Sequence, residues 1–246
     1  MPIFDAHAYL ESTPFTKAMA TPAAVVRTQQ RYDITAVVLI SGLAARCDFV
    51  VGNKKLREQL HPPSGLYGYV TLNPAYPEES QEEMRTHLIR REFVGSVLFG
   101  QAGNPVTLDD VRDIVIAQRR FSKPMAIHTP DAESVHAARE IAAEFPSVKF
   151  ILLGMGGDQW STAIAAAKQT LNLYLEISGS MDADKIAQAA VALTPRKLLF
   201  GSGMPHQDVE LTAGLIEDTS ILTAADRSRI FYHNALSLFN TQASAE

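Results

Sequence analysis

Pro2-Ile3-Phe4-Asp5-Ala6-His7-Ala8-Tyr9 opens the chain with an apolar run that predicts a buried β-strand. Asp5, His7 and Tyr9 occupy alternate positions in this run, and alternate side chains of a strand share one face. Polar side chains on a buried strand need partners, because an unsatisfied buried polar group costs free energy. The stretch therefore predicts a strand whose polar face meets a metal ion, a substrate or its own polar neighbours.

Outward from this stretch, short apolar runs alternate with longer amphipathic segments. The runs are bounded by Gly, Pro, Asn or Ser and are typical of buried strands: Ile3–Tyr9, Thr35–Ile40, Leu66–Leu72, Phe93–Phe99, Pro124–His128, Val148–Leu153, Leu171–Ile177 and Lys197–Ser202. The predicted helices are Pro22–Tyr32, Pro77–Arg91, Leu108–Phe121, Ala132–Phe145, Asp158–Lys168, Asp182–Leu193, Val209–Asp218 and Ala224–Phe239. Thr107, Asp131 and Thr223 each precede a predicted helix and are favourable N-cap residues.

Strands that alternate strictly with helices predict a parallel sheet. Eight such units in 246 residues match the size of a TIM barrel, so the predicted fold is α/β, a (β/α)8 barrel. A doubly wound sheet is the rival architecture but usually has fewer strands. No linker divides the chain, which indicates a single domain over residues 1–246. We expect Ser41–His61 to form a loop with a short helix over the barrel mouth, and the polar tail Thr241–Glu246 to fray.

Composition excludes several classes of protein. The chain is 46% hydrophobic and 20% charged, which suits a folded domain with a sizeable core. Its net charge of −5 argues against non-specific nucleic-acid binding. Cys47 is the only cysteine, so no intrachain disulfide or cysteine zinc site is expected. With no recognisable signal peptide or membrane-spanning run, we expect a cytoplasmic protein with a small-molecule ligand. A homodimer is common for such barrels, although nothing in the sequence requires one.

In a TIM barrel the chemistry lies at the C-terminal ends of the strands. The predicted strands deliver these residues there: His7, Tyr9, Ser41, Asn73, His128, Thr129, Gly154, Glu176, Ser178, Ser202, Gly203 and His206. We therefore expect the polar members of this set to meet at one barrel mouth.

These strand ends resemble those of the amidohydrolase-related family, the metal-dependent hydrolases and decarboxylases of the amidohydrolase superfamily. The resemblance runs nearly from end to end. It is carried by Phe4-Asp5-Ala6-His7-Ala8-Tyr9, Thr71-Leu72-Asn73-Pro74, Phe93-Val94-Gly95, Ile127-His128-Thr129, Met155-Gly156-Gly157, Gly201-Ser202-Gly203-Met204-Pro205-His206 and Phe231-Tyr232-His233-Asn234-Ala235. It implies a distorted (β/α)8 barrel and a hydrolase-like ancestry.

The resemblance also implies a divalent metal, held by two histidines of strand one, histidines ending strands five and often six, and an aspartate ending strand eight. His7 and His128 match this pattern. Tyr9, Gly154 and Gly203 stand where the family has the other three ligands. Because a catalytic zinc needs about three protein ligands, we interpret His7 and His128 as remnants of a degenerate metal site. We expect no cofactor or, failing that, one weakly held divalent metal such as zinc.

The candidate catalytic residues are His7, His128 and the spare carboxylate Glu176 at the end of the seventh strand. The candidate substrate-binding residues are Tyr9, Asn73, Ser202 and His206. Structural roles compete with each of these: a satisfied histidine pair, a salt-bridged glutamate, a tyrosine that fills the space of a lost ligand, or a histidine that caps a helix.

Three functions stay open on the sequence alone. One is an enzyme that hydrolyses or decarboxylates a small cyclic or carboxylated molecule, with His7, His128 and Glu176 in acid–base or weak metal-binding roles. The second is a non-catalytic binding or assembly protein that kept the fold and lost the chemistry. The third is a metal-independent lyase or isomerase that uses His7 and His128 as its proton-transfer pair. Fold alone does not choose among them.

Overall fold

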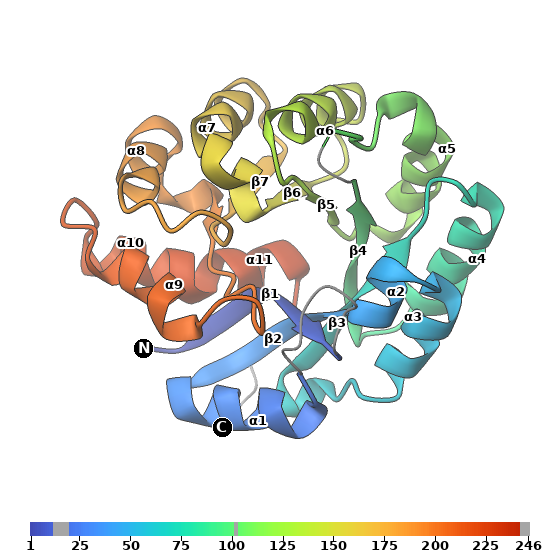
Figure 1. The fold of residues 1–246 in the computed structure, drawn as a ribbon, viewed down its shortest axis with the longest axis horizontal. Coiled ribbons are helices and arrows are strands. Elements are labelled where there is room, and N and C mark those ends of the chain that lie inside the picture. The colour runs from blue at the N-terminus through green and yellow to red at the C-terminus, as the bar shows by residue number, and fades with distance from the viewer. Residues whose placement is uncertain (12–19, 101–102, 242–246) are drawn as a thin grey trace.

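All eight strands form one barrel in the computed structural model, which describes residues 1–11, 20–100 and 103–241 (Figure 1). The strands lie side by side in chain order, and each neighbouring pair is parallel. Their bounds are β1 Ile3–Leu10, β2 Ile34–Ser41, β3 Leu66–Leu72, β4 Phe93–Phe99, β5 Met125–His128, β6 Phe150–Leu153, β7 Leu173–Glu176 and β8 Leu198–Leu199. The predicted α/β fold, a (β/α)8 TIM barrel, is confirmed.

The barrel closes between β1 and the segment that follows β8. Ala6 N donates to Phe200 O at 2.9 Å, and Gly203 N donates to His7 O at 2.8 Å. β8 itself is shorter than the predicted strand Lys197–Ser202, because Phe200 N donates to Ile230 O in the C-terminal helical region and leaves the strand ladder. The closing segment therefore reaches β1 as irregular backbone, which carries Ser202 and Gly203 to the barrel mouth.

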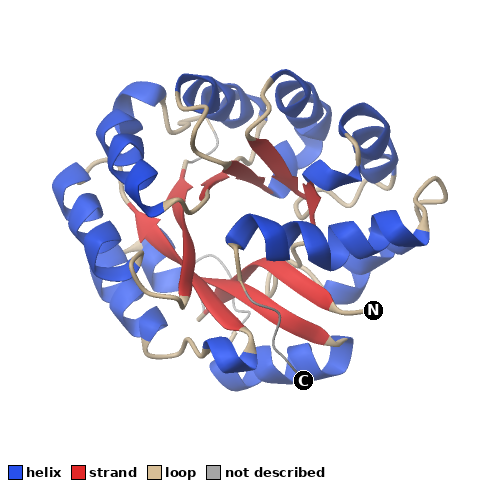
Figure 2. Ribbon diagram, turned by 180° about the vertical axis from the view of Figure 1, so that it is seen from behind, coloured by secondary structure: helices blue, strands red, loops and turns tan. Residues whose placement is uncertain are grey.

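Most helices surround the barrel on its outside, whereas α11 lies across one end of it (Figure 2). Their bounds are α1 Pro22–Tyr32, α2 Gly42–Arg46, α3 Phe49–Arg57, α4 Pro77–His87, α5 Leu108–Gln118, α6 Ala132–Glu144, α7 Trp160–Gln169, α8 Asp184–Leu193, α9 Val209–Glu217, α10 Ala224–Ser228 and α11 Asn234–Phe239. The predicted N-caps are confirmed: Thr107 and Thr223 form capping boxes, and Asp131 Oδ1 accepts from Ser134 N at 2.9 Å. No helix within residues 1–11, 20–100 and 103–241 is long and apolar enough to cross a membrane.

Two predicted segments differ in detail. Ser41–His61 contains two helices, α2 and α3, rather than one, because Asp48 provides a second N-cap and accepts from Val51 N at 2.9 Å. The last predicted helix is divided into α10 and α11 by a π-helical turn at Arg229–His233. Residues 242–246 of the tail that was expected to fray lie outside the described residues.

The core has one layer inside the barrel and another between the sheet and the helices. Helix α11 belongs to the inner layer: the Phe239 ring lies 5.6 Å from Phe4 and 5.9 Å from Tyr69 between centroids. Phe4 lies at the N-terminal end of β1, and Tyr69 is the middle residue of β3. Helix α11 therefore fills the inside of the barrel from that side, and the functional side chains gather at the opposite mouth.

Strand β1 does not keep the simple alternation that its sequence predicts. Its register against β2 shifts between Asp5 and Ala8, where three steps along β1 match two steps along β2. Such a β-bulge places one extra residue in the strand and redirects the neighbouring side chains. Asp5 and His7 consequently find different partners, although the sequence places them on one face.

Candidate active site

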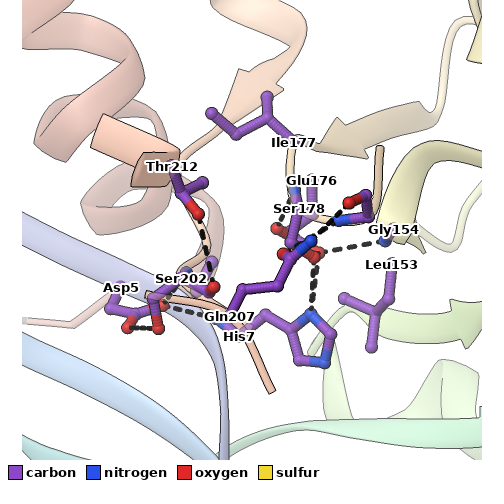
Figure 3. Close-up of polar contacts among 12 residues, drawn as sticks. Asp5, His7, Leu153, Gly154, Glu176, Ile177, Ser178, Ser202, Gln207 and Thr212 are labelled. Carbon is purple, nitrogen blue, oxygen red and sulfur yellow. Dashed lines mark hydrogen bonds and ion pairs between the residues drawn. The ribbon is translucent and has the colours of Figure 1, made fainter. Parts of the chain in front are cut away.

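A buried histidine–glutamate pair lies at the mouth, between β1 and β7 (Figure 3). His7 Nδ1 lies 2.8 Å from Glu176 Oε2, and the side chains are 5% and 0% exposed. Burial raises the pKa of Glu176, but the charge and hydrogen bond of His7 and two bonds from Ser178 outweigh burial and hold it below its ordinary value. Glu176 is thus ionised and accepts, so Nδ1 of His7 carries a proton and donates.

Backbone and side-chain groups donate hydrogen bonds to both oxygens of the Glu176 carboxylate. Its Oε1 accepts from Ser178 N at 2.7 Å, and its Oε2 accepts from Ser178 Oγ at 2.8 Å and from Gly154 N at 3.0 Å. The donors come from the ends of β6 and β7, so the pair with His7 ties three strands together. This arrangement leaves His7 with a single ring orientation. Its other nitrogen, Nε2, is buried and has no hydrogen-bond partner among the described residues.

A buried lysine holds the loop that carries Ser178. Lys185, at the start of α8, is 0% exposed, and its Nζ donates to the carbonyl oxygens of Ile177, Ser178 and Ser180. Burial lowers the pKa of Lys185 to about 8, although the charges of Glu176 and Asp182 raise it. The loop after β7 therefore packs as one rigid unit around the ammonium group.

Asp5 serves the closure of the barrel. Its Oδ1 accepts from Ser202 N at 2.9 Å and its Oδ2 from Ser202 Oγ at 2.5 Å, while His7 N donates to Oδ1 at 3.1 Å. Burial raises the pKa of Asp5 to about 6, against these hydrogen bonds. Both side chains are fully buried. The structure thus places Ser202, a candidate substrate-binding residue, on Asp5; its contact with substrate stays a prediction.

A cavity of about 650 Å³ opens beside the His7–Glu176 pair, over the ends of β1 to β5. Its lining includes three candidate site residues, Tyr9, Asn73 and His128, together with Phe49, Phe99 and Arg46. His7, Glu176, Ser202 and His206 lie outside the lining. The predicted site residues thus divide into a cavity wall and a buried network behind it.

Tyr9 lies between the network and the cavity. Its ring contacts the rings of His7 and His206 edge-on, each at 5.0 Å between centroids. Burial and the nearby charge of Glu176 raise the pKa of the Tyr9 phenol, against the opposing charge of Arg46. The phenol therefore stays protonated at neutral pH, and its ring packs against His7.

His128 ends β5 on the cavity wall, with its ring 5.6 Å from that of Phe99. Burial lowers its pKa to about 4, and the charges of His7 and Arg46 add to this effect. A hydrogen bond to the Gly100 backbone acts in the opposite direction. His128 is consequently neutral at neutral pH. Its Nδ1 is buried without a hydrogen-bond partner in the described parts of the chain.

The donor set does not fit the metal site that the fold family implies. No group of three or more His, Cys, Asp or Glu side chains that could hold a metal ion exists among the described residues. At Gly203, where the family has an aspartate, an added Cβ would lie 3.0 Å from Gln207 Oε1 and 3.3 Å from Ser178 Cβ. These two side chains therefore pack against Gly203. His7 Nε2 and His128 Nδ1 are the nitrogens that remain for a divalent ion, and two imidazoles bind it weakly.

Replacing Gly201 by alanine is expected to lower the free energy of unfolding by about 3 kcal/mol or more. A Cβ at this position would lie 2.1 Å from Glu176 Oε1, and the bonded carboxylate has no free direction in which to move. Urea unfolding measures the loss. Gly214→Ala is the matched control, because a Cβ there meets nothing within 4 Å and alanine favours the helix. An unchanged midpoint for Gly201→Ala would show that the Glu176 network is loose.

Comparison with known proteins identifies the family of the chain. The sequence profile described as amidohydrolase matches residues 9–241. The chain belongs to the amidohydrolase family. No curated protein sequence matches it.

Several solved structures share this amidohydrolase barrel. They include 2,6-dihydroxybenzoate decarboxylase from Rhizobium, at 15% identity and a TM-score of 0.79, with 98% of this chain and 99% of that chain covered. A dihydroxybenzoic acid decarboxylase from a Polaromonas species, with bound manganese and the inhibitor 2-nitroresorcinol, has 16% identity, a TM-score of 0.77 and 97% coverage of both chains. 4-Oxalomesaconate hydratase from Rhodopseudomonas palustris has 15% identity and a TM-score of 0.73, covering 97% of this chain and 96% of that one. At these identities the likeness establishes the fold.

Sequence reasoning placed Ser178 at the barrel mouth without making it a candidate site residue, and it missed the roles of Gln207 and Gly201. Ser178 bonds both His7 and Glu176, and its position two residues after a strand-end carboxylate was the available signal. The Gln207 side-chain amide accepts from Gly179 N through its oxygen and donates to Gly179 O through its nitrogen, and so joins the loops after β7 and β8. Gly201 leaves the space that Glu176 occupies. No sequence pattern identifies the last two, because their role depends on which loops meet.

Proposed function

We propose that this amidohydrolase-family protein is a lyase that decarboxylates a small aromatic acid by proton transfer through His7, without a resident metal ion. The observation that carries the proposal is the state of the His7 ring. Glu176 holds Nδ1 at 2.8 Å, while Nε2 has no partner among the described residues. A carboxylate that orients one imidazole nitrogen leaves the other to act as an acid or base. The substrate class follows the decarboxylases whose barrels this chain resembles.

The proposed reaction replaces a carboxylate by a proton. The ring carbon that bears the carboxylate gains a proton from Nε2 of the His7 imidazolium, the bond between this carbon and the carboxylate breaks, and carbon dioxide leaves. The electrons of the broken bond return to the ring. His7 regains its proton from solvent, so the net change is the uptake of one proton and the release of one molecule of carbon dioxide per turnover. The charge of Glu176 stabilises the imidazolium before transfer.

His128 has a separate part in this proposal. It lines the cavity and is neutral, since its pKa lies at about 4 because of burial and the charges of His7 and Arg46. A neutral imidazole accepts a hydrogen bond or a proton from a ring hydroxyl of the substrate. Such withdrawal of a proton increases the electron density of the ring and favours protonation at carbon. In this proposal His7 is the donor and His128 the acceptor on one ligand, and the Tyr9 ring must move aside, because it contacts His7 and His7 lies outside the cavity lining.

Substrate contact by the other candidate binding residues stays a prediction. Asn73 lines the cavity, and its Oδ1 accepts from Ala75 N at 3.0 Å, which fixes the amide toward its own turn. Tyr9 offers its protonated phenol at the cavity wall. His206 contacts the Tyr9 ring from the exposed side. A substrate contact for Ser202 requires its release from Asp5.

The direct test is release of carbon dioxide from a panel of hydroxylated benzoates that includes 2,6-dihydroxybenzoate. We expect turnover of at least one member, at the same rate with and without EDTA. Turnover that appears only on addition of manganese or zinc would contradict the metal-independent mechanism. If panel members raise the melting temperature but none loses carbon dioxide, the non-catalytic binding function replaces the enzyme.

Metal analysis of the purified protein is expected to find zinc and manganese far below one ion per chain. The physical reason is that glycine at positions 154 and 203 offers no side-chain donor and Tyr9 stays protonated, which leaves two imidazoles for a site that needs about three ligands. Plasma mass spectrometry after growth in medium supplemented with both metals makes the measurement. About one ion per chain would overturn the interpretation, and would assign Glu176 or Tyr9 as a replacement ligand.

A further inference from the structure

The cavity beside His7 has one charged side chain among the described residues of its wall. Phe49, Phe99 and Tyr9 supply aromatic surface, and none of the described lining residues is an aspartate, glutamate or lysine. Arg46 carries the one full charge among those residues at neutral pH, since His128 is neutral. The volume of about 650 Å³ suits a ligand built on one ring. A cavity of this kind favours a flat anion over a neutral or cationic molecule.

The backbone that carries Arg46 has a defined position. Helix α2 begins directly after β2, where Ser41 Oγ accepts from Ala44 N at 3.2 Å. Helix α3 lies against it without intervening side chains, because a Cβ at Gly52 would lie 2.4 Å from Ala44 N. This close approach requires glycine and fixes the end of α2 at the rim of the cavity. Arg46 is thus held over the mouth, although its side chain is exposed.

The field of Arg46 reaches the side chains around the mouth. Burial is the main cause of the shifted pKa values of Tyr9, His128 and His206, and the charge of Arg46 acts on all three. Glu176 also acts on Tyr9 and His128, but it is paired with His7 behind the cavity wall. An anion in the cavity would therefore meet the positive charge of Arg46 before the negative charge of Glu176.

We propose that Arg46 binds the carboxylate of the ligand, so that the cavity selects an aromatic monoanion over the uncharged molecule of the same shape. The identity of the reacting ring rests on the decarboxylase function proposed above. The charge selection does not, because it concerns binding alone. A guanidinium binds a carboxylate through two parallel N–H donors, a geometry that a lysine ammonium does not provide.

Titration calorimetry with benzoate and benzamide tests this selection, since the two probes share a shape and differ in charge. We expect the unaltered protein to bind benzoate at least about tenfold more tightly than benzamide, the size of effect that a charge-assisted hydrogen bond supplies. Arg46→Gln is expected to weaken benzoate binding about tenfold or more and to leave benzamide within about twofold. Arg46→Lys is expected to lie between the two. Lys54→Gln, an exposed cation on α3 outside the cavity lining, is the matched control and should keep the full preference.

Equal affinity of the unaltered protein for both probes, or no binding of benzoate, would overturn the proposal. An equal loss of both probes in Arg46→Gln would also overturn it, because it would assign Arg46 a role in the shape of the mouth. Neither probe needs to react. If the protein prefers benzoate to benzamide but releases no carbon dioxide from any member of the hydroxybenzoate panel, the decarboxylase function is refuted and the anion site is retained.

Discussion

Replacing His7 by asparagine is expected to lower kcat for decarboxylation by about 10²- to 10⁴-fold, the usual contribution of a positioned acid–base group. The asparagine amide can still bond Glu176, but it has no counterpart of the imidazole Nε2 that could transfer a proton. Because Tyr9 and His128, rather than His7, line the cavity, KM for the substrate should change by much less than kcat. Rates of carbon dioxide release over a range of substrate concentrations separate the two effects.

A second buried histidine–glutamate pair provides the control. His87 Nε2 lies 3.3 Å from Glu83 Oε2 on α4, and both side chains are buried. This pair lies outside the cavity lining and bonds Asn53 of α3, which in turn holds β3. His87→Asn should therefore cost stability and leave kcat unchanged. Equal losses of kcat in His7→Asn and His87→Asn would show that the effect of His7 arises from general destabilisation.

Glu176→Gln is expected to lower kcat by about 10²-fold or more and the free energy of unfolding by about 3 kcal/mol. The neutral amide cannot stabilise an imidazolium at His7. Its NH2 group would also face an N–H or O–H group that now donates to the carboxylate, so that two donors would oppose each other. Urea unfolding and carbon dioxide release measure the two losses. Glu83→Gln removes a buried carboxylate of similar burial from the other pair and should lower stability without lowering kcat.

The same variant has a predicted pH signature. Although burial acts in the opposite direction, His7 and Ser178 hold the pKa of Glu176 below its ordinary 4.5 in the folded protein. A carboxylate with a depressed folded pKa stabilises the fold above the unfolded value, and this stability is lost as the pH falls through the folded pKa. Unfolding free energies of the unaltered protein should therefore fall below about pH 4.5, and those of Glu176→Gln should fall less steeply. Parallel curves for the two proteins would contradict ionised Glu176 as the partner of His7.

Most of the architecture could be predicted because it depends on local signals. Apolar runs of the right length, alternating with amphipathic segments, are enough to indicate eight parallel strands, and the caps at Thr107, Asp131 and Thr223 follow from residue type and spacing. The errors fall where a tertiary contact overrides the local signal. β8 ends at Leu199 because Phe200 bonds Ile230, thirty residues further along the chain. The bulge in β1 likewise depends on its neighbour β2.

The candidate site could be predicted in its components but not in its connections. Glu176, His7 and His128 are recognisable as residues at strand ends, since the fold places such ends at one mouth. That Glu176 pairs with His7, while His128 turns to the cavity, depends on side-chain directions that no spacing specifies. Arg46 illustrates the same limit, because the sequence leaves open whether a cation in the segment after β2 meets an anionic substrate or only solvent.

The sequence by itself determined the barrel and the family resemblance, because both depend on residue identity along the chain. Only the tertiary structure decided which side chains surround Gly203 and Glu176. Gln207 and Ser178 pack beside Gly203, and Glu176 accepts two hydrogen bonds from its neighbour Ser178 and two from His7 and Gly154, which the fold brings to it. The physical reason is that a buried charge is stable only where several donors converge on it, and convergence is a property of the fold.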